Sequence, residues 1–341
     1  PTEPTEPAEP TDPAEPTDPA EPTDPDEPGG MKDPEAPKVP VYSPEMMGYL
    51  SNLQAANTMF NLKFHDRIYL PGEKGLWMRA QAGFNKIGTS LSSDLSAKAD
   101  YYTIHLGKDL VRDETYQVGV MAALGHTTGT ARNNRAGTKA DFSNNGFALG
   151  VYGSYTPTEH RYLDSWVQYV NVSNKIDNRD GSAEKYHSKG FVASIEGGYA
   201  FNLSDNVYLQ PQAQFTYMGV KADTHRERSG AVVSSNRGNI EMRLGARLYG
   251  ENVLFNGTTT PYVEVNYFHN TKPFEIAVES QKGRTAFAAK DMRNIYQLEA
   301  GVVSKLNQDW KMGGSLSYAQ GKSSSSYRDT KVKFELRYDF R

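Results

Sequence analysis

Residues 331–340 read KVKFELRYDF, and charged and apolar side chains alternate along the whole stretch. In an extended strand, successive side chains point to opposite faces, so one face here is apolar and the other is charged. A soluble sandwich would turn the charged face to water, whereas a transmembrane barrel turns the apolar face to lipid and the charged face to its lumen. This strand fits both folds, and the rest of the chain must decide between them.

The same period of two runs from Gly75 to the end of the chain, with no second helical pattern. No apolar run approaches the 18 residues that a transmembrane helix needs, but strands that alternate give only a weak hydropathy signal. The mean hydropathy of −0.66 therefore does not exclude a membrane barrel. Twelve strands are predicted, at 75–87, 98–111, 115–126, 144–156, 161–173, 188–202, 206–220, 238–250, 260–269, 292–306, 309–320 and 327–340.

The predicted connections alternate in length. Long polar connections alternate with tight turns such as 156–159 and 307–309. Outer-membrane barrels have short periplasmic turns and long external loops, and aromatic girdles at both interfaces. Aromatic residues also fall near the predicted strand ends, on both sides. We therefore expect an all-β fold, a closed twelve-stranded antiparallel outer-membrane barrel over 75–341. The long connections are predicted at 88–97, 127–143, 174–187, 221–237, 270–291 and 321–326.

One helix is predicted before the strands, within a linker at 41–74. Ser43, Pro44 and Glu45 form a helix start, with a Ser N-cap, Pro at the first helical position and an acid in the first turn. A helix over about 44–66 would be roughly 35 Å long, close to the height of a membrane barrel. It could pack on a soluble core, or it could fill a polar lumen as a plug. Polar residues and aromatics on the predicted pore helix are Asn52, Gln54, Asn57, Asn61, Phe60 and Phe64.

The first 40 residues have a different composition. Proline occurs at every third position from Pro1 to Pro28, with ten carboxylates and no Lys or Arg. Polyproline II has three residues per turn, so this period predicts a stalk roughly 90 Å long. Without the stalk, the net charge changes from −4 to +6. Because Pro1 falls inside the repeat, we expect the chain to be part of a longer one. The absence of Cys excludes disulfides and thiolate metal sites.

Several stretches resemble the autotransporters of type V secretion, especially the branch of the diffuse-adherence adhesins. The resemblance implies a twelve-stranded translocator in the bacterial outer membrane. It also implies a pore filled by the linker helix after export of an upstream passenger, an adhesin or virulence factor. The Asn-Asn cleavage motif of the serine-protease branch is missing, so no autoproteolysis is predicted. The matching stretches are 55–60, 65–67, 76–79, 164–169, 196–199, 211–214, 260–266 and 269–273.

The resemblance also implies partners: outer-membrane lipids, the passenger in cis and the barrel-assembly machinery, which reads a C-terminal aromatic. Here Arg341 follows the final aromatic, which departs from the family pattern. No nucleic-acid partner is expected, and the protein is expected to be monomeric. The expected assembly signal consists of Phe334, Leu336, Tyr338 and Phe340.

Charged residues on the predicted inner faces are candidates for lumen electrostatics and for contacts with the plug. The alternatives are a porin or an outer-membrane protease or phospholipase, which would need Asp/His or Ser/His groups. No fixed-spacing partner accompanies the His residues, and no metal or phosphate motif occurs. We therefore predict no catalytic residues, no metal, no cofactor and no enzyme activity. The predicted lumen set is Arg79, His105, Asp164, Glu196, Arg243, Arg247, Glu264, Glu299, Lys333, Glu335 and Arg337.

Overall fold

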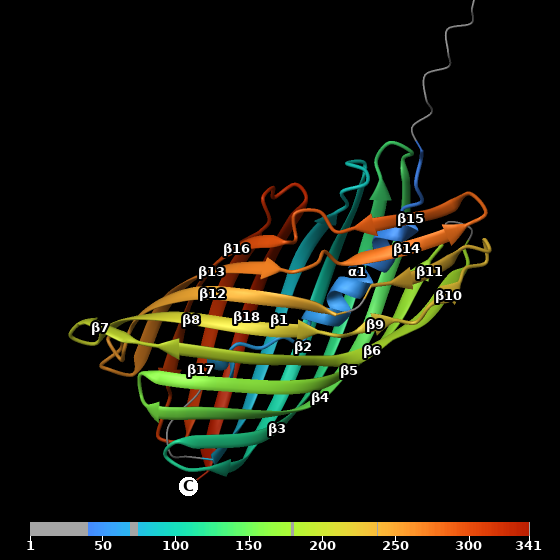
Figure 1. Ribbon diagram of the computed structural model, residues 1–341. Coiled ribbons are helices and arrows are strands. Elements are labelled where there is room, and N and C mark those ends of the chain that lie inside the picture. The colour runs from blue at the N-terminus through green and yellow to red at the C-terminus, as the bar shows by residue number, and fades with distance from the viewer. Residues whose placement is uncertain (1–39, 69–73, 179–180, 237, 341) are drawn as a thin grey trace, which may run out of the picture. The chain divides into compact units, whose positions relative to one another are not determined.

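The computed structural model describes residues 40–68, 74–178, 181–236 and 238–340, and in them twelve strands close an antiparallel barrel (Figure 1). Neighbours in sequence pair with each other, β6 pairs with β8, and β18 pairs with β1 to close the ring. The strands are β1 (Lys74–Gly88), β2 (Leu95–Arg112), β3 (Tyr116–Asn133), β4 (Thr138–Thr158), β5 (Arg161–Asp177), β6 (Ala183–Tyr199), β8 (Val207–Met218), β12 (Asn239–Gly250), β13 (Thr259–Asn270), β16 (Asn294–Lys305), β17 (Trp310–Gln320) and β18 (Tyr327–Phe340).

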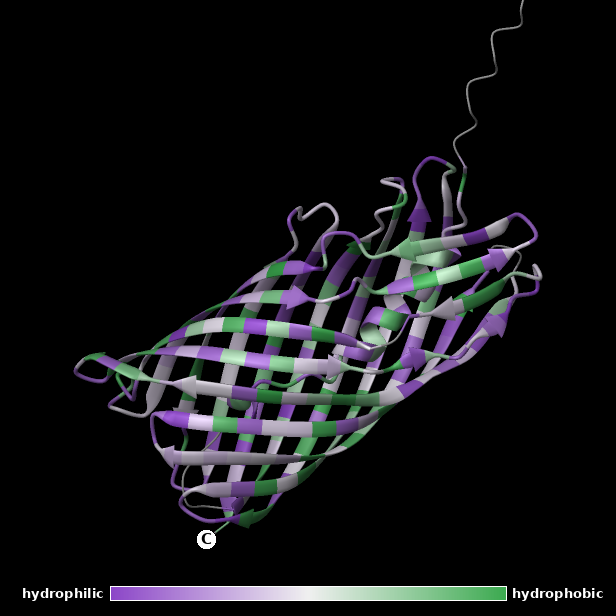
Figure 2. Cartoon of the chain, viewed as in Figure 1, coloured by the Kyte–Doolittle hydropathy of each residue, from purple (hydrophilic) through white to green (hydrophobic). Residues whose placement is uncertain are grey.

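The barrel wall is apolar outside and polar inside. On β18, Val332 and Phe334 are exposed, while Lys333 and Glu335, which alternate with them, are buried. Hydrophobic and hydrophilic residues alternate along strand after strand (Figure 2). An exposed apolar face on a closed barrel suits lipid and not water, because water would hydrate it at a large cost. This arrangement confirms the predicted transmembrane barrel and excludes the sandwich.

The two rims of the barrel differ. The rim at 113–115 and 159–160 carries short connections and is called the turn rim, and the opposite rim is called the loop rim. The predicted long connections 127–143 and 174–187 are wrong, because β3 to β6 run on as hydrogen-bonded strands through most of them. The outward side chains of these extensions are polar, such as Arg132, Lys139 and Asp141, so the sequence there lacks the apolar outer face by which strands were predicted.

Two other predicted loops are also partly strand. Connections 221–237 and 270–291 contain β10 (His225–Arg226), β11 (Val232–Ser235), β14 (Glu275–Ser280) and β15 (Gly283–Ala288), which form a separate four-stranded sheet at the loop rim. Ile276 and Phe287 of this sheet are buried, and Phe287 meets the ring of Tyr42 edge-on at 5.3 Å. Two short strands extend the barrel wall: β7 (Phe201–Ser204), which pairs with β8, and β9 (Lys221–Ala222), which pairs with β6.

The helix is shorter than predicted. Helix α1 spans Glu45–Thr58, and a 3-10 turn, η1, spans Phe64–Arg67. Pro44, not Ser43, occupies the N-cap position, and the Ser43 hydroxyl instead bonds the Glu45 carboxylate. Within the described ranges, no helix has both the length and the apolar character needed to cross a membrane. The stalk up to residue 39, the predicted helix end at 71–72 and Arg341 lie outside the described residues.

Candidate functional site in the barrel lumen

Helix α1 lies inside the ring of strands (Figure 1), and every residue from Glu45 to Asn57 is buried. An amphipathic helix on a soluble core would keep one polar face in water. Here polar and apolar residues are enclosed alike, so the helix is a plug and not a surface helix. Gly48 marks the closest approach to the wall, because a Cβ there would come within 2.9 Å of the Ile176 side chain and 3.2 Å of Phe142.

The predicted polar residues of the helix bond to the wall at two positions. Asn52 accepts a hydrogen bond from the Asn144 amide at 3.0 Å. Asn57 donates to the carbonyl of Val220 at 3.0 Å, and its amide oxygen accepts from the N–H of Val220 at 3.1 Å. Buried amides need such partners, since an unpaired one costs about 1–3 kcal/mol. Gln54 instead bonds Thr58 within the helix, at 2.8 Å.

The backbone loses its helical hydrogen bonds after Thr58, and wall side chains replace them. Carbonyls that are buried away from water must find donors. Each carbonyl from Met59 to Leu62 accepts at least one hydrogen bond from a strand residue. The donors are Gln81 to Met59 at 3.3 Å, Gln168 to Phe60 at 2.9 Å, Arg79 to Asn61 at 2.9 Å, and Trp166 and Gln214 to Leu62 at 3.1 and 2.8 Å. This capture explains why the helix ends earlier than its sequence predicts.

The two predicted plug aromatics fill defined spaces. The Phe60 ring lies over Gly125 and Gly146, where an added Cβ would come within 3.1 and 3.2 Å of it. His105 meets the same ring edge-on, with centroids 5.7 Å apart. Phe64 stacks on the Tyr162 ring at 4.0 Å between centroids, with a 10° angle between the planes. Both rings are therefore fixed by close contacts with their neighbours as well as by burial.

Lys63 is the first of three linker charges that pair with the wall. Its ammonium group lies 2.7 Å from the carboxylate of Glu264 on β13 and 2.8 Å from that of Glu299 on β16. Both carboxylates are almost completely buried. Removal of two carboxylates from water is costly, and a cation in direct contact offsets that cost.

The other two linker charges lie on η1. Asp66 contacts Lys333 of β18 at 2.5 Å, and its second oxygen lies 3.7 Å from the guanidinium of Arg79. Arg67 forms an ion pair with Asp164 of β5, which also accepts a hydrogen bond from Ser154 at 2.6 Å. The three linker charges thus bind strands from several sides of the barrel.

Further wall charges complete this plug network. Arg243 contacts Glu196 at 2.7 Å and Glu264 at 3.5 Å, and Arg247 lies 3.4 Å from Glu264. Glu335 is 3.0 Å from Lys333. The wall supplies four cations and five carboxylates, and the linker supplies two cations and one carboxylate. Within this network, the linker residues therefore offset the excess charge of the wall residues. The wall members are Arg79, Asp164, Glu196, Arg243, Arg247, Glu264, Glu299, Lys333 and Glu335.

The structure buries all eleven predicted lumen residues, and nine of them belong to the plug network. His105 packs against Phe60 instead. Arg337 belongs to a separate cluster, with ion pairs of 2.6 Å each to Asp109 and Asp339. The four residues of the expected assembly signal lie on the outer face of β18, where Tyr338 packs against Trp310 with centroids 4.8 Å apart.

Several lumen residues were missing from the sequence prediction. They are the linker charges Lys63, Asp66 and Arg67 and the carbonyl donors Gln81, Gln168 and Gln214. Most fall within or beside the stretches that carried the family resemblance, such as 65–67, 164–169 and 211–214. That overlap was the available signal, because their partners lie more than 80 residues away in sequence, except for the pairs Asp66–Arg79 and Gln81–Met59.

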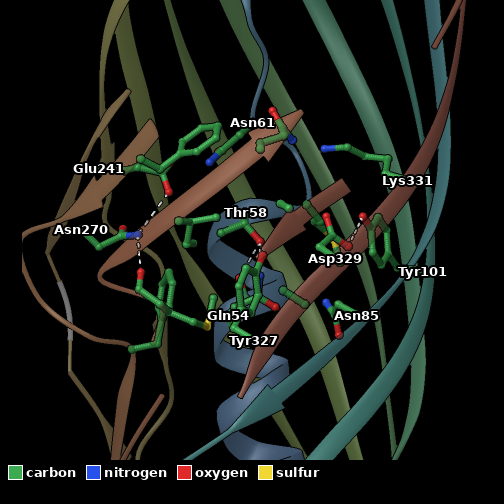
Figure 3. Close-up of a pocket in the computed structure, with 18 of the residues that line it drawn as sticks. Gln54, Thr58, Asn61, Asn85, Tyr101, Glu241, Asn270, Tyr327, Asp329 and Lys331 are labelled. Carbon is green, nitrogen blue, oxygen red and sulfur yellow. Dashed lines mark hydrogen bonds between the residues drawn. The ribbon is translucent and has the colours of Figure 1, made fainter. Parts of the chain in front are cut away.

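A small cavity remains beside the plug (Figure 3). It has a volume of about 150 Å³ and lies between α1 and strands β1, β13, β16 and β18. Its polar wall includes Tyr101, which donates to Asp329 at 2.8 Å, and Asn270, whose amide lies 3.4 Å from the Glu241 carboxylate. No cluster of three or more His, Asp or Glu residues suited to a metal occurs in the part of the chain that the structure describes.

The plug has a direction. Gly48, in the first turns of α1, lies beside Phe142 and Ile176, near the ends of β4 and β5 at the loop rim. Arg67 pairs with Asp164, near the end of β5 at the turn rim. The chain therefore passes through the lumen from the loop rim to the turn rim, where β1 begins.

Comparison with known proteins points to one family. The family model described as autotransporter beta-domain matches residues 76–317. The chain is 29% identical over 338 residues to the uncharacterized protein YdeU of Escherichia coli K12, covering 88% of this chain and 70% of that protein. It is 25% identical over 319 residues to the autotransporter adhesin AIDA-I of Escherichia coli, covering 84% of this chain and 24% of that protein. The chain thus spans about a quarter of that adhesin.

Solved structures share the fold. The transport unit of AIDA-I from Escherichia coli superposes with a TM-score of 0.80 at 23% identity, covering 88% of this chain and all of that one. The translocator domain of NalP from Neisseria meningitidis gives 0.58 at 14% identity, covering 79% of this chain and 89% of that one. Because the family model matches well over half of the chain, the protein belongs to the autotransporter β-domain family, as a translocator domain of the bacterial outer membrane.

Proposed function

We propose that this β-domain exports an N-terminal passenger through its lumen and then anchors it at the cell surface, with residues 41–68 left behind as the plug. The plug network carries this proposal: its three linker residues have one excess positive charge, and its nine wall residues have one excess negative charge. The linker also runs from the loop rim to the turn rim, as a chain that had passed outwards would. Residues 1–40 would then be the stalk between barrel and passenger.

The passenger is proposed to be an adhesin or virulence factor, since one relative bears the name of an autotransporter adhesin. The β-domain itself is proposed to have no enzyme activity. The outward residues Phe334, Leu336, Tyr338 and Phe340 are proposed to guide the barrel-assembly machinery, and the apolar outer face to contact lipid.

Conductance in planar lipid bilayers tests the plug. We expect the whole chain to conduct weakly, and a variant lacking residues 41–70 to conduct much more, because the lumen then contains only water. A variant lacking residues 1–40 is the matched control and should conduct like the whole chain. Heat-modifiable mobility in gels verifies that each variant forms a barrel. Equal conductance with and without residues 41–70 would contradict the plug and favour a porin.

Export is tested separately. A small epitope-tagged polypeptide fused before Pro1 should become accessible to external protease on intact cells. The same fusion with the barrel truncated after β17 is the control, because an open barrel cannot insert. A tag that stays protected in cells whose barrel is correctly inserted would refute the export proposal.

A further inference from the structure

Three cations face one another on the outer wall near the loop rim. In the strand register, Arg328 of β18 lies opposite Lys86 of β1, and Lys86 lies opposite Lys98 of β2. All three side chains point outwards, because each lies an even number of residues from an exposed residue on its own strand. Those exposed residues are Phe84, Tyr102 and Val332. Directly opposed residues have Cβ atoms about 4.5–5.5 Å apart, and like charges so placed destabilise a sheet. These three residues are called the cation row.

The cation row has no counterion among the residues that the structure describes. None of the ion pairs or side-chain hydrogen bonds between described residues involves Lys86, Lys98 or Arg328. The nearest outward acid on these strands is Asp100, which lies opposite Phe84, one row closer to the membrane centre. Three neighbouring cations with one offset acid leave an excess of positive charge that an external anion would neutralise.

Two adjoining grooves lie on this part of the outer wall. The upper groove, of about 640 Å³, contains the cation row together with Arg132, Asp100 and Asp141. The lower groove, of about 520 Å³, is bounded by Ala82, Phe84, Tyr102, His126 and Val332. Phe84, Asp100 and Thr128 belong to both grooves, so the two are continuous. A positively charged groove therefore continues into a largely apolar one further down the wall.

The height of the cation row selects the ligand. Lys86 lies two residues beyond Phe84 towards the loop rim, which is about 7 Å along the strand. Exposed aromatic residues such as Phe84 and Tyr102 mark the interface between hydrocarbon and headgroups. The cation row therefore lies at the depth of lipid headgroups in the outer leaflet, with the apolar groove at the depth of acyl chains.

We propose that the cation row and the two grooves bind a phosphorylated glycolipid of the outer leaflet, with its phosphates on Lys86, Lys98 and Arg328 and an acyl chain along Ala82 and Phe84. Phosphate groups suit this arrangement, because Lys and Arg both form strong charge-assisted hydrogen bonds to phosphate oxygens. Binding would neutralise the repulsion within the row, so the lipid would stabilise the seam between β18, β1 and β2. This site is independent of export and of the plug.

Lipid binding by the refolded whole chain in neutral detergent tests the site. Three probes are compared: diphosphoryl lipid A, the same lipid without its phosphates, and inorganic phosphate. The variant carries Lys86→Gln, Lys98→Gln and Arg328→Gln. The matched control carries Lys74→Gln, Lys108→Gln and Arg161→Gln, which removes three exposed cations at the turn rim. Native mass spectrometry measures affinity, and heat-modifiable gel mobility measures barrel stability.

We expect diphosphoryl lipid A to bind the unmodified chain and the control alike, and the cation-row variant about a hundredfold more weakly, from roughly fivefold for each cation. Without lipid, the variant should be at least as stable as the unmodified chain, because like-charge repulsion is gone. Equal affinity of the variant and the unmodified chain would overturn the proposal. The proposal would also be overturned if the dephosphorylated lipid bound as tightly as diphosphoryl lipid A. It would likewise be overturned if inorganic phosphate alone bound as tightly or stabilised the barrel as much as that lipid.

Discussion

Replacement of Lys63 by Met should loosen the plug without unfolding the barrel. Lys63 contacts two buried carboxylates, Glu264 at 2.7 Å and Glu299 at 2.8 Å. Met has a similar length but no charge, so both carboxylates lose their linker partner while the strand pairing stays intact. The three linker residues of the plug network would then lose the excess positive charge that matches the nine wall residues.

The magnitude follows from the partners that remain. Loss of one member of a buried ion pair costs about 3–5 kcal/mol. Glu264 keeps Arg247 at 3.4 Å and Glu299 keeps Lys333 at 2.9 Å, so the lower end applies. A cost of about 3 kcal/mol corresponds to roughly a hundredfold increase in the ratio of open to plugged barrels.

Single-channel recording in planar bilayers measures that ratio as open probability. Lys63→Arg keeps the charge and should remain largely closed, and Lys185→Met removes an exposed lysine of β6 as a control. Adding Glu299→Gln to Lys63→Met restores the charge balance and should recover part of the closure, as in a double-mutant cycle. An open probability for Lys63→Met within threefold of the unmodified chain would refute the role of the plug network.

Other substitutions test separate parts of the structure. Asn57→Ala removes both bonds to the backbone of Val220 and should destabilise the plugged state by about 2 kcal/mol, seen as a higher open probability. Asn171→Ala, at a half-buried position on the outer face of β5, should have no effect. Gly48→Val places methyl groups against Ile176 and should cost about 1–3 kcal/mol in the same assay; an unchanged open probability would mean that the helix shifts freely. Arg337→Met removes the guanidinium shared by Asp109 and Asp339, which keep Arg112 at 3.6 Å and Lys311 at 2.7 Å. It should therefore lower the free energy of barrel unfolding in urea by about 3 kcal/mol, with the open probability unchanged. A change confined to open probability would contradict the separation of that cluster from the plug.

The plug and the barrel differ in how far the sequence predicts them. Strand positions follow from alternation, which is a local property, so β18 has the predicted bounds and β12, β13, β16 and β17 lie within two residues of theirs. The apolar outer face ends where a strand leaves the membrane, because its outward side chains are then polar. For this reason the outer parts of β3 to β6, and the hairpin β14–β15, were predicted as loops.

The sequence by itself determined that the strands have one apolar and one charged face, because successive side chains of a strand point to opposite sides. Alternating connection lengths and aromatic residues near the strand ends then predicted a barrel over a sandwich. Only the tertiary structure decided where the helix ends and which charges meet. Gln81, Gln168 and Gln214 capture the carbonyls after Thr58, and Lys63 reaches Glu264 and Glu299 from about 200 residues away in sequence. Such contacts depend on barrel closure and on the threading of the linker, which no local pattern encodes.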